Sequence, residues 1–382
     1  MLPLLRECQR MVRDPLYLSS IILPPLVCYL LFTSLMAEGL PTKLPTGVVD
    51  MDDSHTSRSI VRNLDAYQHT YIVSHYPTAH EAFDAMQRGD IYGFYLIPER
   101  MEAEALAEKQ PTVSFYLNEA YLIAGALLYK DMRTLSELTN ADIGEEQLYA
   151  RGAAQWQVMP ILQPIVIEPH PLGNPWLNYS VYLNNTLLPG VLLLTVMLVT
   201  VYSIGSELKQ GTAQEWLAAA NGKILSALLG KLLPQTCLFF AMALLCDAWL
   251  FGFLHFPLGG GLLPMLVALF LSVLATQAFG IFLFCLFPWM RMAMSAAALW
   301  SVVSFSISGF SFPAMAMSPT IQMLNNLFPL RHYFLIYANS ALNGYAMGHA
   351  ATSYVALCLF LLLPLPFLGR FKRVLMTYEY ME

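Results

Sequence analysis

The residues best placed to do chemistry lie between two strongly apolar stretches, in a segment that begins at Glu207 and ends near Pro234. Its polar and aromatic landmarks are Glu207, Gly211, Thr212, Glu215 and Trp216. Thr212 and Glu215 have the spacing of a capping box, in which the hydroxyl accepts a backbone N–H and the carboxylate reaches back to the cap residue. The pattern predicts a short helix over residues 213–220, which either presents a face to a partner or lies on the membrane surface.

Motifs for catalysis are absent from the sequence. Gly222-Lys223 and Gly230-Lys231 lack the upstream glycine and the following hydroxyl of a phosphate-binding loop, and no CxxC or HExxH spacing is present. The cluster Asp50-Met-Asp-Asp-Ser54 fits a hard cation. It also fits a strand end that leads into a helix N-cap, with acids near the helix N-terminus. We adopt the N-cap interpretation and predict no catalytic residue and no metal site.

The elements that must position these residues are membrane spans. Hydrophobic residues make up 57% of the 382 residues and charged residues only 12%, whereas soluble domains carry roughly 25% charge. A span needs about 20 mostly apolar residues. Six segments qualify: Leu16–Ala37, Thr186–Gly205, Ile224–Phe253, Leu262–Phe287, Met292–Phe312 and Ala351–Gly369.

Two charges interrupt the third span. A charged residue inside a span is a functional candidate by default. Lys231 lies close enough to one end of the span to snorkel toward the interface, and Asp247 is expected near the outer end. We therefore expect structural roles for both.

Basic residues beside the spans predict the orientation, because Lys and Arg accumulate in cytoplasmic loops. Three arginines precede the first span, and further Lys and Arg residues follow spans two, four and six. With six spans, all of these fall on one side, so both termini are expected in the cytoplasm. The first span also has the basic start of a cleaved signal peptide, but its apolar stretch is long for that role.

Residues 38–185 are predicted to form an extracytoplasmic α/β domain. They hold nine Lys and Arg residues against nineteen Asp and Glu. Strand-like runs at 46–50, 71–74, 91–97 and 111–117 alternate with helical patterns that begin near Ser54, Thr78 and Tyr121. Thr78 and Glu81 have capping-box spacing, and Gly89 ends that helix. Strands that alternate with helices favour a small sheet with some parallel pairing.

Several motifs follow one another in a specific order along nearly the whole chain. They are Val48-Val-Asp-Met-Asp-Asp-Ser54, Pro189-Gly190, Glu207-x-x-x-Gly211-Thr212, Gly230-Lys231-Leu-Leu-Pro234, Ser308-Gly-Phe-Ser-Phe-Pro313 and Leu327-Phe-Pro-Leu330. In this order the sequence resembles the ABC type-2 exporter permeases. It departs from their pattern at Leu208-Lys209-Gln210 and Ala220-Asn221, where the family commonly has an extra charged pair and a proline.

The resemblance implies a permease subunit without an ATPase of its own, so that ATP and Mg²⁺ would be bound by a separate ATP-binding cassette protein. It implies that Glu207, Gly211, Thr212, Glu215 and Trp216 couple to that ATPase through the helix at 213–220. It also implies an amphipathic interfacial helix within residues 1–15. There Arg6, Arg10 and Arg13 share one face, opposite Leu5, Cys8 and Val12, although ordinary positive-inside flanking would also explain the three arginines.

Residues 313–350 contain too many prolines and glycines to form a full span. In the resembling family this region returns into the outer leaflet as short helices. Irregular backbone at that depth is tolerated only where it is buried in protein or lines a cavity. We therefore expect an outer gate that includes Pro313, Pro329 and Leu330.

The expected protein is an α-helical polytopic membrane protein with six transmembrane helices, an inserted α/β domain and a cytoplasmic tail at 370–382. It would be a homo- or heterodimeric permease of a bacterial inner membrane that exports an amphipathic, drug-like or lipid-like compound. A periplasmic adaptor and an outer-membrane channel are further possible partners, and nucleic acid is not. The alternatives are a membrane-anchored sensor with an external ligand domain and an ion-driven secondary transporter, which would need midplane ionisable residues and internal repeats.

Overall fold

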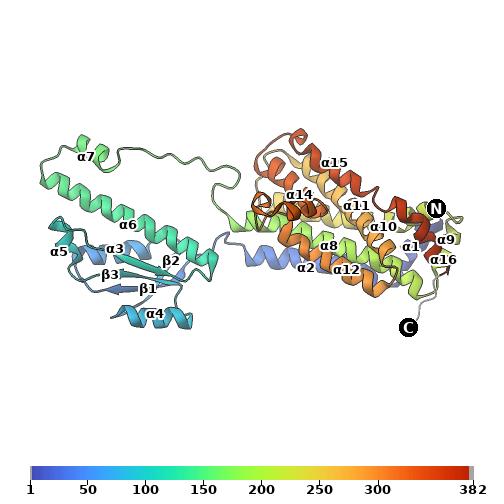
Figure 1. Ribbon diagram of the computed structural model, residues 1–382, viewed down its shortest axis with the longest axis horizontal. Helices are drawn as coiled ribbons and strands as arrows, with labels where there is room; N and C mark the ends of the chain where they lie inside the picture. The colour runs from blue at the N-terminus through green and yellow to red at the C-terminus, as the bar shows by residue number, and fades with distance from the viewer. Residues whose placement is uncertain (1, 378–382) are drawn as a thin grey trace. The chain divides into compact units, whose positions relative to one another are not determined.

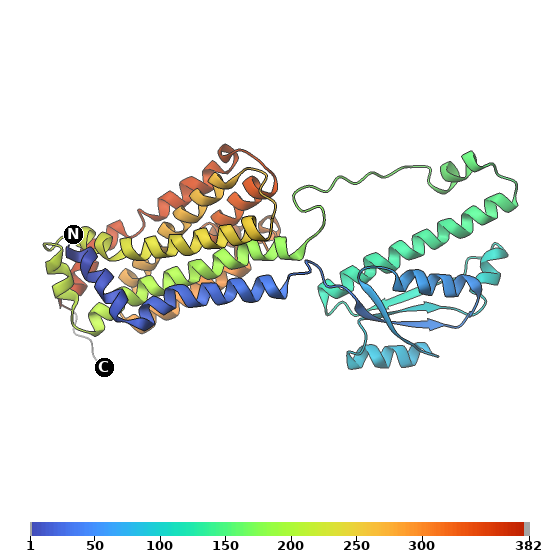
Figure 2. The same cartoon turned by 180° about the vertical axis from the view of Figure 1, so that it is seen from behind.

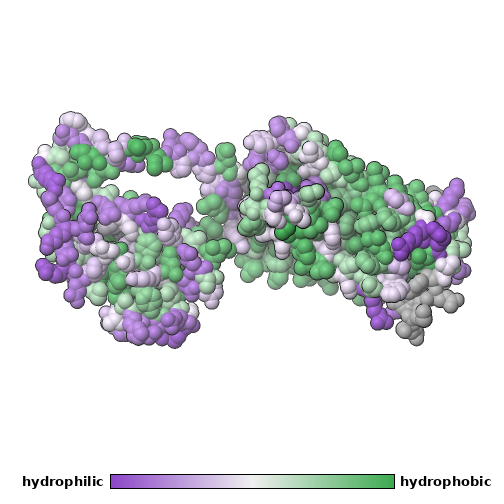
Figure 3. Space-filling model, in the orientation of Figure 1, coloured by the Kyte–Doolittle hydropathy of each residue, from purple (hydrophilic) through white to green (hydrophobic). Residues whose placement is uncertain are grey.

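The computed structural model describes residues 2–377, which form two compact units. The membrane unit comprises Met1–Gly39 and His170–Glu382, and the α/β unit comprises Leu40–Pro169. Six helices are long and apolar enough to cross a membrane, as predicted. In Figure 3 the flank of the membrane unit is largely apolar, and hydrophilic residues gather at the end where residues 2–13 and 368–377 lie.

The membrane unit contains most of the helices. In chain order they are α1 (Leu2–Arg13), α2 (Pro15–Leu35), α8 (Tyr179–Lys209), α9 (Ala213–Ala219), α10 (Ile224–Asp247, continued by the π-helix Ala248–Phe253), α11 (Leu262–Leu286), α12 (Met290–Ile307), α13 (Pro319–Asn325), α14 (Pro329–Tyr337), α15 (Ala351–Phe360) and α16 (Leu368–Thr377). Helix α8 is central, since it packs against α2, α11 and α12.

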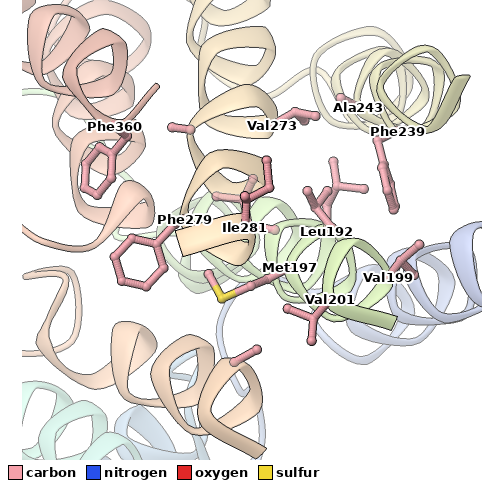
Figure 4. Packing of buried hydrophobic residues seen from close by; sticks show 14 of the residues in the cluster. Leu192, Met197, Val199, Val201, Phe239, Ala243, Val273, Phe279, Ile281 and Phe360 are labelled. Atoms are coloured by element: carbon pink, nitrogen blue, oxygen red, sulfur yellow. The ribbon is translucent and has the colours of Figure 1, made fainter. Parts of the chain in front are cut away.

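The core of the membrane unit forms around α8. Figure 4 shows Leu192, Met197 and Val201 of α8 close to side chains from the neighbouring helices, among them Phe279 and Ile281 of α11. Water does not drive helices together inside a bilayer, so close packing of this kind must hold them. Small residues permit it. At Gly190 and Gly205 of α8, an added Cβ would lie within 3 Å of a side chain from another helix.

Three predicted spans differ from the observed helices. Helix α8 begins at Tyr179 rather than Thr186, because the Asn178 side chain accepts the Val181 N–H as an N-cap. Helix α12 ends at Ile307 rather than near Phe312, and the backbone then turns at Gly309 with φ of +102°. The last span, Met347–Thr377, is interrupted around Pro364. The expected tail at 370–382 is helical up to Thr377, and residues 378–382 lie outside the described part.

The α/β unit contains a four-stranded sheet in the order β2-β1-β3-β4. The strands are β1 (Leu44–Asp50), β2 (Thr70–His75), β3 (Gly93–Ile97) and β4 (Ser114–Leu117). Strand β1 pairs in parallel with β2 and β3, and β4 is antiparallel to β3. The helices are α3 (His55–Asp65), α4 (Ala79–Arg88), α5 (Met101–Leu106), α6 (Leu122–Ala150) and α7 (Gln155–Leu162). The sequence patterns above do not predict α5 and α7.

Helices cover both faces of this sheet, with α4 on one side and α3 and α6 on the other (Figure 1). Val49 packs toward α4, whereas its neighbour Val48 packs toward α3 and α6, because successive strand residues point to opposite faces. The compact unit ends at Pro169, before the predicted boundary at residue 185.

The acidic cluster after β1 forms a helix cap. Asp50 Oδ1 accepts the backbone N–H groups of Asp52 and Asp53, and Asp50 Oδ2 accepts the Ser57 hydroxyl at 2.7 Å. Ser54 caps α3 by accepting the Ser57 N–H. The N-cap interpretation of this cluster is confirmed. At α4, Thr78 accepts the Glu81 N–H, but its hydroxyl approaches the Glu81 carboxylate, so only half of that capping box forms.

Candidate functional site

Helices α1, α9 and α16 lie at the same end of the membrane unit in both views (Figures 1 and 2). Helix α9 joins the end of α8 to the start of α10. Glu207 stands near the end of α8 and Lys231 in the second turn of α10, so the two side chains meet beneath α9. The site is built around these two residues.

The Glu207 carboxylate is fully buried and contacts four polar side chains. Arg6 of α1 donates from its two terminal guanidinium nitrogens, Nη1 to Oε1 and Nη2 to Oε2, each at 2.9 Å, which is the geometry of the strongest charge-assisted pairs. Lys231 Nζ donates to Oε1 at 2.8 Å. The Thr212 hydroxyl donates to Oε2, and the Arg10 guanidinium forms a further ion pair with the carboxylate. One carboxylate thus joins α1, α8, α10 and the start of α9.

A second carboxylate, that of Glu7, extends the contacts of Glu207 into a buried network that reaches α2. Glu7 is 1% exposed and accepts Lys231 Nζ at 2.6 Å and the Tyr17 hydroxyl at 2.6 Å. The Gln235 amide donates to the Ser203 hydroxyl at 3.1 Å and also approaches Glu7. Lys231 itself is fully buried between the two glutamates. The interpretation that Lys231 snorkels is therefore wrong, because its fully buried ammonium pairs with two buried carboxylates.

Helix α1 forms over residues 2–13, within the range predicted for the interfacial helix, and it turns two of its three arginines toward the membrane unit. Its buried side chains include Glu7 and Met11, whereas Leu5 and Val12 are exposed. Arg10 donates to Ser206 at 3.0 Å and to Gln210 at 2.7 Å, so it turns toward α8 as Arg6 does. Arg13 alone among the three arginines is exposed. Charge pairing decides this arrangement, since buried charges require opposite partners.

A glycine allows α1 to approach α10. A Cβ at Gly230 would lie 2.6 Å from Pro3 Cβ and 3.2 Å from the Leu4 backbone nitrogen. Gly230 immediately precedes Lys231, so the close approach brings α1 to the turn that carries the buried ammonium. The Gly-Lys pair of the sequence motif therefore has a packing role and a charge role.

Helix α9 contacts the network through its inner face. Trp216 is 1% exposed, its indole N–H donates to the Ala227 carbonyl at 3.2 Å, and Lys231 Nζ lies 5.0 Å from its ring centroid. That distance is within the range of a cation–π contact. The prediction of a capping box at Thr212 and Glu215 is wrong, because Thr212 makes no side-chain cap and its hydroxyl binds Glu207 instead.

Within the part of the chain that the structure describes, the outer face of α9 is exposed and open to a partner protein. Gln214, Glu215 and Ala218 are exposed, as are Gly211 and Asn221 at the two ends of the helix. Gly211 and Asn221 have positive φ values of +70° and +53°, which tighten the turns on either side of α9. Gln214 also donates to the Met376 carbonyl of α16 at 3.2 Å. Helix α9 therefore has a buried face against the network and an exposed face away from it.

The structure gathers five of the eight residues predicted for this end of the molecule. Glu207, Thr212, Trp216, Arg6 and Arg10 meet in or beside the network, whereas Gly211, Glu215 and Arg13 are exposed. Sequence reasoning missed Glu7 and misread Lys231. A signal existed for Lys231, because it is a charged residue inside an apolar span and such residues require a buried partner.

Comparison with known protein families decides the classification. The family described as ABC-2 family transporter protein matches residues 15–368. The chain belongs to this family. A comparison with curated proteins finds no match. Members of the ABC-2 family are the membrane subunits of transporters, and membership implies a separate ATPase partner and embedding in a membrane.

The region expected to form an outer gate is made of short helices in this ABC-2 family member. They are the 3₁₀ turn Ala314–Ala316, α13 and α14, followed by the π-helix Ala338–Leu342. Pro313 is exposed, whereas Pro329 and Leu330 at the start of α14 are buried against α8 and α12. Phe328 stacks on Trp300 with centroids 4.6 Å apart, and Arg331 donates to the Ser308 carbonyl at 2.8 Å. The short helices are thus anchored to α12.

Asp247 lies at the opposite end of α10 from Lys231. It is 2% exposed, and neither carboxylate oxygen forms a hydrogen bond within the described residues. An unpaired buried carboxylate is costly in a bilayer unless it is protonated. No hydrogen bond among the described residues supports the expected structural role of Asp247.

Proposed function

We propose that the chain is the export permease of an ABC transporter and that it receives work from its ATPase through the exposed face of α9. The buried network carries this proposal. Trp216 and Thr212 tie α9 to Lys231 and Glu207, and those residues hold α1, α8 and α10 together. A push on α9 would then move three elements as one body. Isolated side-chain contacts would transmit less, because each could yield separately.

Exposed basic residues at the α9 end of the membrane unit support the proposed orientation of the chain in the membrane. Arg13, Lys209, Lys223, Arg370 and Lys372 are exposed there or adjoin it, and Lys and Arg mark the cytoplasmic side. The proposed direction of transport is outward across a bacterial inner membrane, with the α/β unit outside. Two such subunits would enclose the path of an amphipathic compound. A periplasmic adaptor and an outer-membrane channel complete the proposed assembly.

The proposed docking face is tested by placing charge and bulk on α9 without touching the network. Ala218 is exposed, so Ala218→Arg adds a large side chain to the face that would meet the ATPase. We expect the purified variant to keep the thermal unfolding temperature of the parent chain. When each is purified from the native organism, the amount of ATP-binding protein that co-purifies should be at least tenfold lower with the variant than with the parent chain. A structural mutation would instead lower the unfolding temperature.

The matched control is Ala66→Arg, the same substitution at an exposed position of the α/β unit. It should leave co-purification unchanged. Equal recovery of the ATP-binding protein with both variants would contradict the assignment of α9 as the docking element. Substitutions of Glu207 or Trp216 do not test docking cleanly, because both side chains are buried in the network.

A further inference from the structure

An apolar groove of about 470 Å³ runs along the flank of the membrane unit. Helices α10 and α11 and the segment that joins α15 to α16 form its walls. The lining includes Leu229, Leu233 and Phe240 of α10, Phe270 and Ile281 of α11, and Leu365. The α10 wall runs from Leu225 to Phe240, which is about 22 Å at the rise of an α-helix. One leaflet contributes about half of a hydrocarbon core roughly 30 Å thick, so the groove is long enough for an acyl chain of one leaflet.

A polar pair interrupts the apolar lining. Thr236 and Gln277 both line the groove and contact each other, with Oγ1 to Oε1 at 2.7 Å. Gln277 is 2% exposed, and its Nε2 has no hydrogen-bond partner within the described residues. A buried amide N–H without an acceptor is unfavourable in a protein interior and more so in a bilayer. The pair is thus a polar point in an otherwise apolar wall, thirteen residues or about 20 Å along α10 from Lys223.

Basic residues stand at the end of the groove nearest α9. Lys223 is the N-cap of α10, two residues before Leu225, and it is exposed. Lys372 lies one helical turn after Leu368 on the same stripe of α16, and it is exposed too. Neither lysine forms an ion pair with a carboxylate among residues 2–377. This end of the groove thus presents positive charge that the described chain does not neutralise.

We infer that the groove holds one anionic glycerophospholipid of the leaflet next to α9. Its acyl chain would fill the apolar walls past Thr236, and its phosphate would lie near Lys223 and Lys372. Basic positions beside grooves between membrane helices select anionic headgroups in this way. The bound lipid lies outside the network beneath α9, and the inference does not depend on the proposed function. It assigns this flank to a resident lipid rather than to a second copy of the chain.

Filling the groove tests the site. The full chain is purified in a mild detergent and incubated with phosphatidylglycerol or phosphatidylethanolamine of identical acyl chains. Native mass spectrometry then measures the mass of the protein with its bound lipids. We expect one phosphatidylglycerol per chain to survive on the parent protein. Cys237→Trp places an indole in the groove from an exposed position of α10 and should abolish that adduct. Leu233→Trp does the same from another exposed lining position and serves if the first variant fails to fold.

The control for groove filling is Leu244→Trp, which adds the same side chain to an exposed position of α10 that does not line the groove. It should keep the adduct. Retention of phosphatidylglycerol by the folded groove-filling variants would overturn the inference. A second result would also overturn it: the parent protein carries no lipid adduct, and the groove-filling variants change from dimer to monomer. In that case the occupant of the groove would be a second copy of the chain.

Charge removal tests the choice of an anionic lipid. Lys223→Gln combined with Lys372→Gln should lower the ratio of bound phosphatidylglycerol to phosphatidylethanolamine by roughly tenfold or more, since each basic residue near a membrane surface contributes a several-fold preference. Lys209→Gln combined with Arg291→Gln removes the same charge from exposed positions that do not adjoin the groove, and it should leave the ratio unchanged. Equal binding of the two lipids to the parent protein would overturn the inference.

Discussion

Glu207 is the residue on which the candidate site depends most. Its carboxylate is the only group in the network that contacts all three of Arg6, Arg10 and Lys231. With Glu7 it balances most of three positive charges, and the Thr212 hydroxyl occupies a remaining acceptor position. A buried pair of this kind adds little net stability over an apolar core, but the loss of one partner leaves charge buried without compensation.

Glu207→Gln should therefore destabilise the protein strongly. The amide is similar in size but leaves Arg6, Arg10 and Lys231 with Glu7 as the one remaining carboxylate of the network. We expect a loss of about 3–5 kcal/mol, the usual effect of breaking a buried ion pair. The loss would be measured as the change in thermal unfolding of the purified protein in detergent.

Glu215→Gln provides the comparison, because it makes the same chemical change on the exposed face of α9. Its effect on unfolding should stay within about 0.5 kcal/mol, as for most surface substitutions. If the two variants unfold alike, Glu207 is not paired as described.

At the scale of elements, the contact between α1 and α10 is the one that brings the charges of the network together. The two helices are distant in sequence, and Gly230 permits their approach at Pro3. Because Glu7 and Lys231 lie one turn or less beyond this contact, a shift of α1 would lengthen the bond between them. The contact between α1 and α10 thus sets the distances between the charged side chains that lie against α9.

Gly230→Ala should separate α1 from α10. The added methyl group would lie 2.6 Å from Pro3 Cβ, so α1 must move. Overpacking of this kind costs about 1–3 kcal/mol, and it should also reduce ATP hydrolysis by a co-purified ATPase if α1 belongs to the body that α9 moves. The measurements are thermal unfolding and the ATPase rate of the complex.

Gly369→Ala is the matched control, since it makes the same change on helix α16, where an added Cβ meets nothing within 4 Å. The alanine should be neutral or stabilise by about 0.4–1 kcal/mol through the loss of backbone freedom in the unfolded chain. A destabilisation equal to that of Gly230→Ala would show that the approach of α1 to α10 does not explain the effect.

At the scale of the whole molecule, the membrane unit and the α/β unit differ in what stabilises them. The sheet of the α/β unit has apolar cores on both faces, as in a soluble domain. The membrane unit turns many apolar side chains outward, because lipid replaces water around it (Figure 3). The proposed orientation places these two units in different surroundings.

Cysteine labelling tests this orientation. Ala66→Cys on the α/β unit and Glu215→Cys on α9 both create exposed thiols. A membrane-impermeant maleimide added to spheroplasts should label Ala66→Cys at once and Glu215→Cys only after the membrane is permeabilised. The parent chain measures the background from its six native cysteines. The opposite labelling pattern would place α9 outside and contradict the proposed direction of energy input.

The sequence by itself determined the features that depend on composition and local pattern. Six apolar stretches predicted six candidate spans, because a bilayer requires about 20 apolar residues per helix. Alternating patterns located all four strands of the α/β unit, and the order of motifs indicated the family. Helix ends were less well predicted. Asn184 and Asn185 hid the start of α8, since their polarity signals a loop although both are buried in the helix.

The tertiary structure alone decided what the charged residues do. Arg6, Glu7, Glu207 and Lys231 occupy three separate parts of the sequence, so no local spacing reveals that they share one site. Ion pairing depends on distance in space, and the approach of α1 to α10 at Gly230 creates those distances. Trp216 shows the same limit. Its place on the short helix was predictable, but its burial against Lys231 follows only from the way α9 folds back onto α10.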